Sequence, residues 1–388
     1  MKPATTIIHR PAGRTHDIDA LTTPIYETTT FVFDSAAQVL EYNQGKNAKY
    51  LYSRYGNPTI TAVEQKLAQL EAAEAALLLS SGQAATTTAL LGLLSAGDEV
   101  VCSSAIYGGT LHLLADLLSK FGVRARFVTL EELSRPDGLF TGTTKMVWFE
   151  SPINPTLRCV DIEAVARACR ARGVLSVIDN TFASPINQQP IALGVDLVMH
   201  SATKYLNGHS DVTAGVLAGP ARLIDPIFKA QKMLGTILDP SAAYSLGRGL
   251  KTLAVRVERH NANAMAVARF LSQDPRVEKV YYPGLESHPD HAIARRQMRG
   301  FGGMVCVDVG GGYDRVARFF DRLTLFNRAA SLGGVESLCS LPVLTSQWGL
   351  SDEELARAGV TKSMARLSVG LEDAEDLIAD LDQALKNP

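Results

Sequence analysis

The sequence lacks several signals that would place it in a specialised class of protein. It has five cysteines in 388 residues, dispersed and without a C-x-x-C pair or a metal-ligand spacing. This pattern predicts reduced thiols in a cytosolic protein without a metal site. The sequence contains no run of about 18 apolar residues, so it predicts no membrane-spanning helix. The first residues show no apolar core of a signal peptide. The formal net charge of −2 gives no reason to expect nucleic acid or an anionic membrane as a partner.

Dinucleotide and repeat signatures are absent as well. We find no internal repeat and no G-x-G-x-x-G behind a predicted strand, and the Gly247-Arg248-Gly249 stretch has no third glycine in register. What remains is the composition of a globular enzyme with a substantial core, since 46% of residues are hydrophobic and 20% are charged. The length is enough for two domains.

The order of apolar and polar segments predicts an α/β fold. Between about residues 75 and 220, short apolar strands alternate with helical periods, which is typical of a mostly parallel sheet with helices on both faces. A single long amphipathic helix is expected over 241–272, leading into a smaller mixed domain. We therefore predict an irregular arm at 1–60 that contacts a neighbouring subunit, a cofactor-binding domain at 61–255 and a C-terminal domain at 256–388.

One stretch carries the most specific chemical signal. Lys204 lies just behind the apolar run 195–200, with Ser201 and Thr203 beside it. Ligands bind at the carboxyl ends of strands in open α/β sheets, and an amine there can form a Schiff base with an aldehyde cofactor whose phosphate the hydroxyls would bind. A solvated lysine is the alternative. Ser-x-x-Lys is also a serine-acylase motif, but the Ser-Asp-Asn and Lys-Thr-Gly partners of that motif are missing.

A second strand end supplies the matching acid. Asp179 closes the apolar strand 174–179, where it is either a helix or loop cap or a partner of Lys204. A pyridoxal ring stores electrons only while its ring nitrogen is protonated, and a buried carboxylate keeps that proton in place. The pair therefore predicts pyridoxal 5'-phosphate.

Further candidates follow other strands. Gly82 and Gln83 begin a helix after a strand, which is an anion site. Tyr107 either stacks on a flat ring or packs in the core, and Asn154 is a ring-oxygen or carboxylate contact. Arg366 lies inside an apolar strand, where it needs a substrate carboxylate or an internal salt bridge.

These residues converge on a known family. The segments 52–59, 107–110, 150–155, 178–181, 201–211, 282–285, 331–334 and 366–372 resemble the pyridoxal-phosphate enzymes of cysteine and methionine metabolism. That group includes cystathionine γ-synthase, cystathionine γ-lyase, cystathionine β-lyase, methionine γ-lyase and the homoserine-ester sulfhydrylases. The resemblance covers nearly the whole chain. It implies fold type I, the aspartate-aminotransferase type, in a homotetramer of two dimers whose active sites are shared between subunits.

The resemblance also assigns roles. It implies that Lys204 bonds the cofactor and moves protons, that Asp179 pairs with the ring nitrogen and that Tyr107 stacks on the ring. The remaining assignments concern the phosphate and the substrate. The phosphate ligands are Gly82, Gln83, Ser201 and Thr203, joined by Tyr52 and Arg54 from the partner subunit. The residues at the ring oxygen and the substrate carboxylate are Asn154, Ser331 and Arg366.

Gln83 stands where the family usually has methionine after the phosphate glycine, and its backbone N–H is expected to bind the phosphate all the same. Two further departures bear on the substrate. Ala330 stands where the γ-synthases and γ-lyases have glutamate. Gln347 and Trp348 stand in a segment that usually reads Met-Thr-His-Ala. We therefore expect α,γ-elimination on a sulfur- or oxygen-substituted homoserine, giving 2-oxobutanoate and ammonia. γ-Replacement, cystathionine β-lyase activity, transamination and a non-catalytic role stay open.

Overall fold

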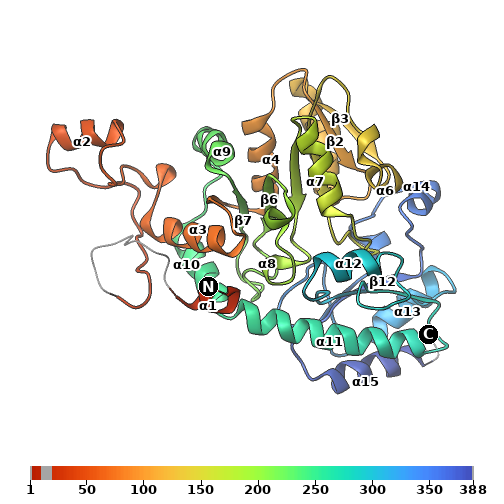
Figure 1. The fold of residues 1–388 in the computed structure, drawn as a ribbon. Coiled ribbons are helices and arrows are strands. Elements are labelled where there is room, and N and C mark those ends of the chain that lie inside the picture. Colours follow the sequence, from red (N-terminus) through yellow and green to blue (C-terminus); the bar gives the residue numbers. More distant parts are fainter. Residues whose placement is uncertain (1, 10–19, 387–388) are drawn as a thin grey trace.

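The computed structural model describes residues 2–9 and 20–386, and it contains a large sheet with helices on both faces (Figure 1). The sheet has the order β1-β7-β6-β5-β4-β2-β3. All its pairings are parallel except those of β7, which runs antiparallel to both β1 and β6. Its strands are β1 (Ala75–Leu79), β2 (Glu99–Ser103), β3 (Arg124–Val128), β4 (Thr144–Glu150), β5 (Leu175–Asp179), β6 (Leu197–Ser201) and β7 (Gly215–Gly219). The mostly parallel sheet predicted for this region is confirmed.

Alternating side chains of the strands feed two separate cores. On one face, Val100, Trp148 and Val177 pack with helices α4 and α9, and on the other face Val147 and Ile178 pack with α7. Helices cover both faces of the sheet, so both sets of alternating side chains are buried. This explains why the strands are apolar throughout. The helices of this half are α3 (Pro58–Leu70), α4 (Gly82–Leu93), α5 (Gly108–His112), α6 (Leu130–Leu133), α7 (Ile162–Ala171), α8 (Ser184–Asn187), α9 (Ala221–Leu234) and α10 (Pro240–Leu250).

A second, smaller sheet follows in the C-terminal part of the chain, with the order β10-β11-β12-β9-β8. Helices α11 and α15 pack on it around one large core that also includes residues of α3 and α10. Its strands are β8 (Lys279–Tyr281), β9 (Met304–Asp308), β10 (Asn327–Arg328), β11 (Leu338–Ser340) and β12 (Met364–Ser368). Its helices are α11 (Leu253–Gln273), α12 (His291–Gln297), α13 (Tyr313–Arg322), α14 (Asp352–Arg357) and α15 (Ala374–Leu385).

Short helical turns connect several of these elements. The turns of the large sheet's half are η1 (Ser53–Tyr55), the π-helical η2 (Leu113–Leu117), η3 (Leu118–Phe121), η4 (Pro136–Gly138) and η5 (Pro190–Leu193), and η6 (Pro342–Leu344) lies in the C-terminal part. Within the described residues, no helix is both long and apolar enough to cross a membrane.

The prediction of a single long helix over 241–272 is wrong. The structure has two helices there, α10 and α11, separated by Lys251 and Thr252. The break lets Arg256 of α11 reach back to three carbonyl oxygens, those of Tyr205, Leu206 and Gly249. Lys251 and Thr252 at the break include neither proline nor glycine, although Gly247 and Gly249 just before them and Thr252 itself are weak helix formers.

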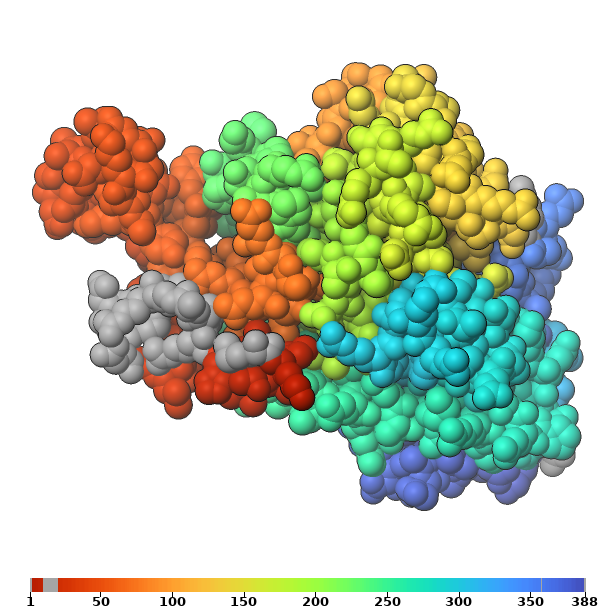
Figure 2. Space-filling view, in the orientation of Figure 1, coloured from red at the N-terminus to blue at the C-terminus, as the bar shows by residue number. Residues whose placement is uncertain are grey.

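The arm expected to be irregular contains two helices, which corrects that prediction in part. Helix α1 (Pro3–Ile8) packs on its own chain, with Ile7 only 1% exposed. Helix α2 (Ala36–Asn43) forms a separate lobe at the left of Figures 1 and 2, and none of its residues is buried. Residues 10–19 of the arm lie outside the described part of the chain. The apolar side chains of Leu21, Val32 and Leu40 point into solvent.

Strand β7 approaches the start of helix α4 too closely for a side chain. A Cβ added at Gly215 would overlap the backbone carbonyl of Ser81, so the substitution Gly215→Ala must displace the helix N-terminus. We expect it to destabilise the protein by about 2–3 kcal/mol, measured as a shift of the urea midpoint. Gly142→Ala is the control, because nothing lies within 4 Å of an added Cβ there. An unchanged midpoint for Gly215→Ala would contradict this account.

Candidate active site

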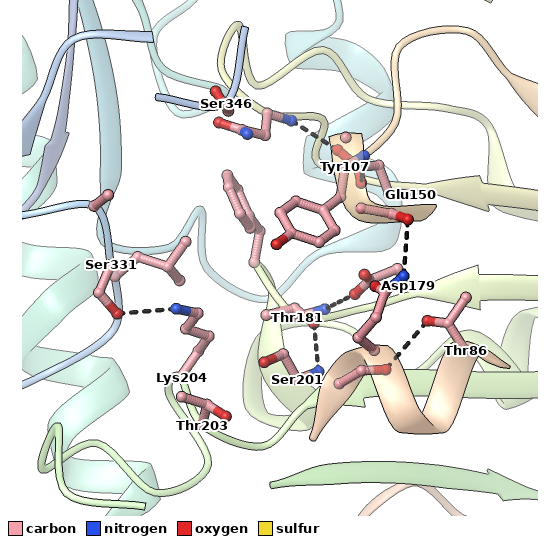
Figure 3. Close-up of a pocket in the computed structure, with 18 of the residues that line it drawn as sticks. Thr86, Tyr107, Glu150, Asp179, Thr181, Ser201, Thr203, Lys204, Ser331 and Ser346 are labelled. Carbon is pink, nitrogen blue, oxygen red and sulfur yellow. Dashed lines mark hydrogen bonds between the residues drawn. The ribbon is translucent and has the colours of Figure 1, made fainter. Parts of the chain in front are cut away.

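A cavity of about 710 Å³ lies at the carboxyl ends of β4, β5 and β6, and loops and strand β12 of the C-terminal part line its other side. Glu150, Asp179 and Ser201 are the last residues of the three strands. Figure 3 shows Lys204 and Tyr107 on opposite sides of this space. The cavity is therefore at the edge where a parallel sheet collects its ligand-binding side chains.

The structure brings together most of the residues that the sequence singled out. Eleven of them line the cavity, namely Gly82, Gln83, Tyr107, Asn154, Asp179, Ser201, Thr203, Lys204, Ala330, Ser331 and Arg366. Trp348 lies at the same cavity and is 73% exposed. Tyr52 and Arg54 do not line it. Arg54 donates to the carbonyl oxygen of Lys232 at 2.8 Å, at a separate surface hollow.

Lys204 has only neutral partners among the described residues. Its Nζ donates to the Ser331 hydroxyl at 2.9 Å, and its carbonyl oxygen accepts the N–H of Gly208. Burial, with Arg366 nearby, lowers the pKa of the Lys204 amine. An amine with a lowered pKa is more often neutral, which is the form that attacks a carbonyl carbon.

Asp179 faces the cavity from the end of β5. Its Oδ1 accepts the N–H of Thr181 at 2.9 Å. Burial raises the pKa of this carboxyl, and the hydrogen bonds from Thr181 oppose the rise. A cation placed against it in the cavity would favour the ionised form.

The start of helix α4 forms an anion cradle. The Ser81 hydroxyl caps the helix by accepting the N–H of Ala84 at 2.9 Å, and the backbone N–H groups of Gly82 and Gln83 have no partner in the described part of the chain. A Cβ at Gly82 would lie 2.9 Å from Cβ of Ser201, so only glycine permits this approach. The Thr203 hydroxyl is already engaged by the backbone of Ala214.

Arg366 enters the cavity from β12 of the second sheet. It is 7% exposed, and its guanidinium donates to Oδ1 of Asn154 at 2.9 Å and to the carbonyl oxygen of Ser331 at 3.3 Å. Its Nε is buried without a partner. Burial lowers the pKa of the guanidinium. Both recorded partners are neutral, so the internal salt bridge that the sequence left open is not found among the described residues.

The sequence reasoning missed Glu150 and Thr181. Glu150 is 5% exposed and accepts two backbone N–H groups, those of Tyr107 at 3.0 Å and Asn154 at 2.9 Å. It pairs in register with Asp179, and burial, with that neighbour, raises the pKa of Glu150 to about 8. Thr181 accepts the N–H of Ser201 at 2.8 Å. The signal for Glu150 was present, because it ends a strand beside the Asp179 strand.

A type I fold with a lysine and a carboxylate at neighbouring strand ends defines a class of enzyme that uses pyridoxal phosphate. Sequence comparison then gives the particular family. The pattern described as Cys/Met metabolism PLP-dependent enzyme matches residues 4–386, and the chain belongs to that family.

Individual relatives agree with this placement. The chain is 44% identical over 386 residues to L-methionine gamma-lyase of Fusobacterium nucleatum subsp. nucleatum, covering 98% of this chain and 97% of that protein. It is 42% identical to cystathionine gamma-synthase 1, chloroplastic, of Nicotiana tabacum, covering 96% of this chain and 69% of that protein. The structure of cystathionine gamma-lyase from Lactobacillus plantarum complexed with L-serine has a TM-score of 0.92 at 38% identity, covering 99% and 98% of the two chains.

The residues present fit pyridoxal phosphate. The free N–H groups at the start of α4 and the glycine beside Ser201 suit a phosphate. The Asp179 carboxyl lies at the same cavity and suits a ring nitrogen that carries a proton. The Lys204 amine, without an acidic partner, suits an aldehyde.

The raised pKa of Glu150 makes the stability of the cofactor-free protein depend on pH. The folded-state pKa of about 8 exceeds the reference value of 4.5, so folding favours the protonated carboxyl. The stability that Glu150 contributes is therefore complete below about pH 4.5 and is lost as pH rises through about 8. We expect Glu150→Gln to remove up to about 1.4 kcal/mol per pH unit of the fall between pH 6 and 8.

Urea midpoints of both cofactor-free proteins, taken at one protein concentration, measure this difference. Glu64, whose pKa is raised to about 7 by burial, titrates equally in both proteins and cancels. Parallel pH curves for the parent and the variant would show that Glu150 keeps an ordinary pKa.

Proposed function

We propose that this enzyme carries out α,γ-elimination on a sulfur- or oxygen-substituted homoserine, giving 2-oxobutanoate and ammonia. The observation that carries the proposal is that Lys204 and a buried Arg366 with neutral partners line one cavity. The arginine offers a fork for an α-carboxylate. A substrate held there would lie within the cavity that also contains the lysine amine, which moves protons at Cα and Cβ.

The other residues of the cavity take supporting roles. The cofactor, when bound, supplies an electron sink for the carbanion at Cα. Asp179 keeps the ring nitrogen protonated, and Gly82, Gln83 and Ser201 hold the phosphate. Thr203 joins them when its hydroxyl turns from the Ala214 carbonyl oxygen to the phosphate. Tyr107 covers the ring and assists proton transfer. Asn154 and Ser331 orient the substrate beside Arg366, and Ala330 leaves the leaving-group side uncharged.

γ-Replacement is the second candidate function, as in a cystathionine γ-synthase or an O-acyl-homoserine sulfhydrylase. The similarity to the Nicotiana tabacum synthase favours it, because the 42% identity is close to the 44% found for the methionine lyase. Elimination and replacement share every step up to departure of the γ-group. They differ in whether a thiol or water reaches the site afterwards. Cystathionine β-lyase activity is the third alternative within this family.

We also infer a homotetramer of two dimers in which the 1–60 arm completes the partner's site. The α2 lobe buries no residue on its own chain, and Val32 is 86% exposed. Tyr52 and Arg54 do not line the cavity of their own chain, and Arg54 lines a separate hollow, so the proposal assigns both to the phosphate of the neighbouring subunit. The proposal keeps the division of the chain into an arm (1–60), a cofactor-binding domain (61–255) and a C-terminal domain (256–388). Five free, buried cysteines support a cytosolic location.

Product analysis tests the reaction and the role of Ala330 together. We expect 2-oxobutanoate and ammonia from methionine or an O-substituted homoserine in preference to cystathionine, because Ala330 offers no partner for a distal ammonium. Ala330→Glu should shift the kcat/KM ratio toward cystathionine about fivefold or more, and Ala330→Gln, which lacks the charge, should not. A parent enzyme that prefers cystathionine tenfold, with no gain from the glutamate, would contradict the assignment.

The carboxylate fork is tested at Arg366. Arg366→Lys keeps the charge but loses the two parallel donors, so KM for the amino-acid substrate should rise roughly 30- to 150-fold. Cofactor content, measured by absorbance, serves as the control and should stay at the parental level. An unchanged KM for every amino-acid substrate would exclude this role.

Sharing of the site is tested by complementation. Arg54→Ala and Lys204→Ala chains are each expected to be nearly inactive alone. Co-expressed in equal amounts, they should recover about a quarter of parental activity, because half of the dimers are mixed and each mixed dimer has one intact site. Recovery of no activity from mixed dimers isolated by two different affinity tags would place Arg54 in its own subunit's site.

A further inference from the structure

The turn that carries Tyr107 has two ties to other parts of the cavity wall. The N–H of Tyr107 donates to Oε2 of Glu150 at 3.0 Å, and the side-chain amide of Gln83 donates to the carbonyl oxygen of Gly109 at 2.8 Å. Tyr107 precedes helix α5 without a side-chain cap of its own. These two bonds therefore fix the turn from the ends of two elements, β4 and α4.

The packing around the turn is close as well as bonded. A Cβ added at Gly109 would lie 2.5 Å from Cε1 of Tyr107 and 3.0 Å from Oε1 of Gln83. The tyrosine ring and the glutamine amide thus meet over the same glycine. The ring is otherwise open, since Tyr107 is 52% exposed. The Tyr107 hydroxyl has no hydrogen-bond partner among the described residues.

Glu150 also connects this turn to the substrate side of the cavity. Its second oxygen, Oε1, accepts the N–H of Asn154 at 2.9 Å. Oδ1 of Asn154 in turn accepts from the Arg366 guanidinium at 2.9 Å. One buried carboxyl therefore joins the backbone behind the ring-covering tyrosine to the residue that orients the arginine.

We propose that Gln83 and Glu150 are positioning residues: Gln83 sets the place of the Tyr107 ring, and Glu150 sets both that ring and the Asn154–Arg366 pair. The inference rests on the proposed function of Tyr107 as the residue that covers the cofactor ring. It gives Gln83 a second task through its side chain, beside the anion contact of its backbone N–H. Neither task follows from the other, so a side-chain substitution separates them.

A double-mutant cycle tests the glutamine. Gln83→Met keeps the length and the backbone N–H but removes the amide donor. In the parental background we expect the dissociation constant of pyridoxal phosphate from the cofactor-free protein to rise about 3- to 10-fold, with a weaker visible circular dichroism band per bound cofactor. In a Tyr107→Ala background the same substitution should change the constant by less than about twofold, because the ring to be positioned is gone.

The outcomes separate this inference from the function beneath it. An equal loss from Gln83→Met in both backgrounds would contradict positioning and leave a general effect on the cradle. A Tyr107→Ala protein that binds pyridoxal phosphate as tightly as the parent would contradict the covering role of Tyr107 itself, and this inference with it.

A second variant distinguishes the two positioning residues. Above about pH 8 the Glu150 carboxyl is ionised, and there Glu150→Gln replaces one acceptor by a donor that faces a backbone N–H. At such a pH it should weaken cofactor binding and also raise KM about 3- to 10-fold through the Asn154–Arg366 pair. Gln83→Met should lower kcat while KM changes less than about twofold. A Glu150→Gln enzyme with the parental KM would contradict the connection to Arg366.

Discussion

The register of three parallel strands is the constraint on which the site depends. Glu150 lies opposite Asp179, and Asp179 lies opposite Met199, two residues before Ser201. Side chains alternate along a strand, so these strand-end residues share a face with Trp148 and Val177 and point toward the α4 side of the sheet. A slip of one residue in β5 would turn Asp179 to the opposite face.

The charged side chains that line the cavity are the second feature of the site. Lys204 and Arg366 are held by neutral oxygens, while the buried carboxyl of Glu150 and the half-buried carboxyl of Asp179 have raised pKa values. The two cations have no acidic partner among the described residues, which is unfavourable for charge held away from water. A ligand with a protonated ring nitrogen, an aldehyde and a carboxylate would offer partners to Asp179, Lys204 and Arg366 in turn, and its phosphate would meet the free N–H groups at the start of α4.

Those parts of the fold and of the site that depend on short stretches of sequence could be predicted. Lys204, Asp179 and Gly82 each follow a short apolar strand, and strand ends of a parallel sheet meet at one edge, so their proximity follows from the pattern. The break between α10 and α11 could not be predicted, because it serves the contact of Arg256 with distant carbonyl groups. The side-chain amide of Gln83 is likewise used by a turn 26 residues away, and no periodicity reports such a contact. Substrate choice at Ala330 and Trp348 depends on the finished shape of the cavity.

The most direct test of the account is to find the lysine that bonds the cofactor. Borohydride reduction of the purified holoenzyme, followed by proteolysis and mass spectrometry, fixes the cofactor to its amine. The account predicts a single phosphopyridoxyl adduct, on Lys204, and its loss in a folded Lys204→Ala protein. An adduct on another lysine in the parent enzyme, or one that survives that substitution at full occupancy, would contradict it.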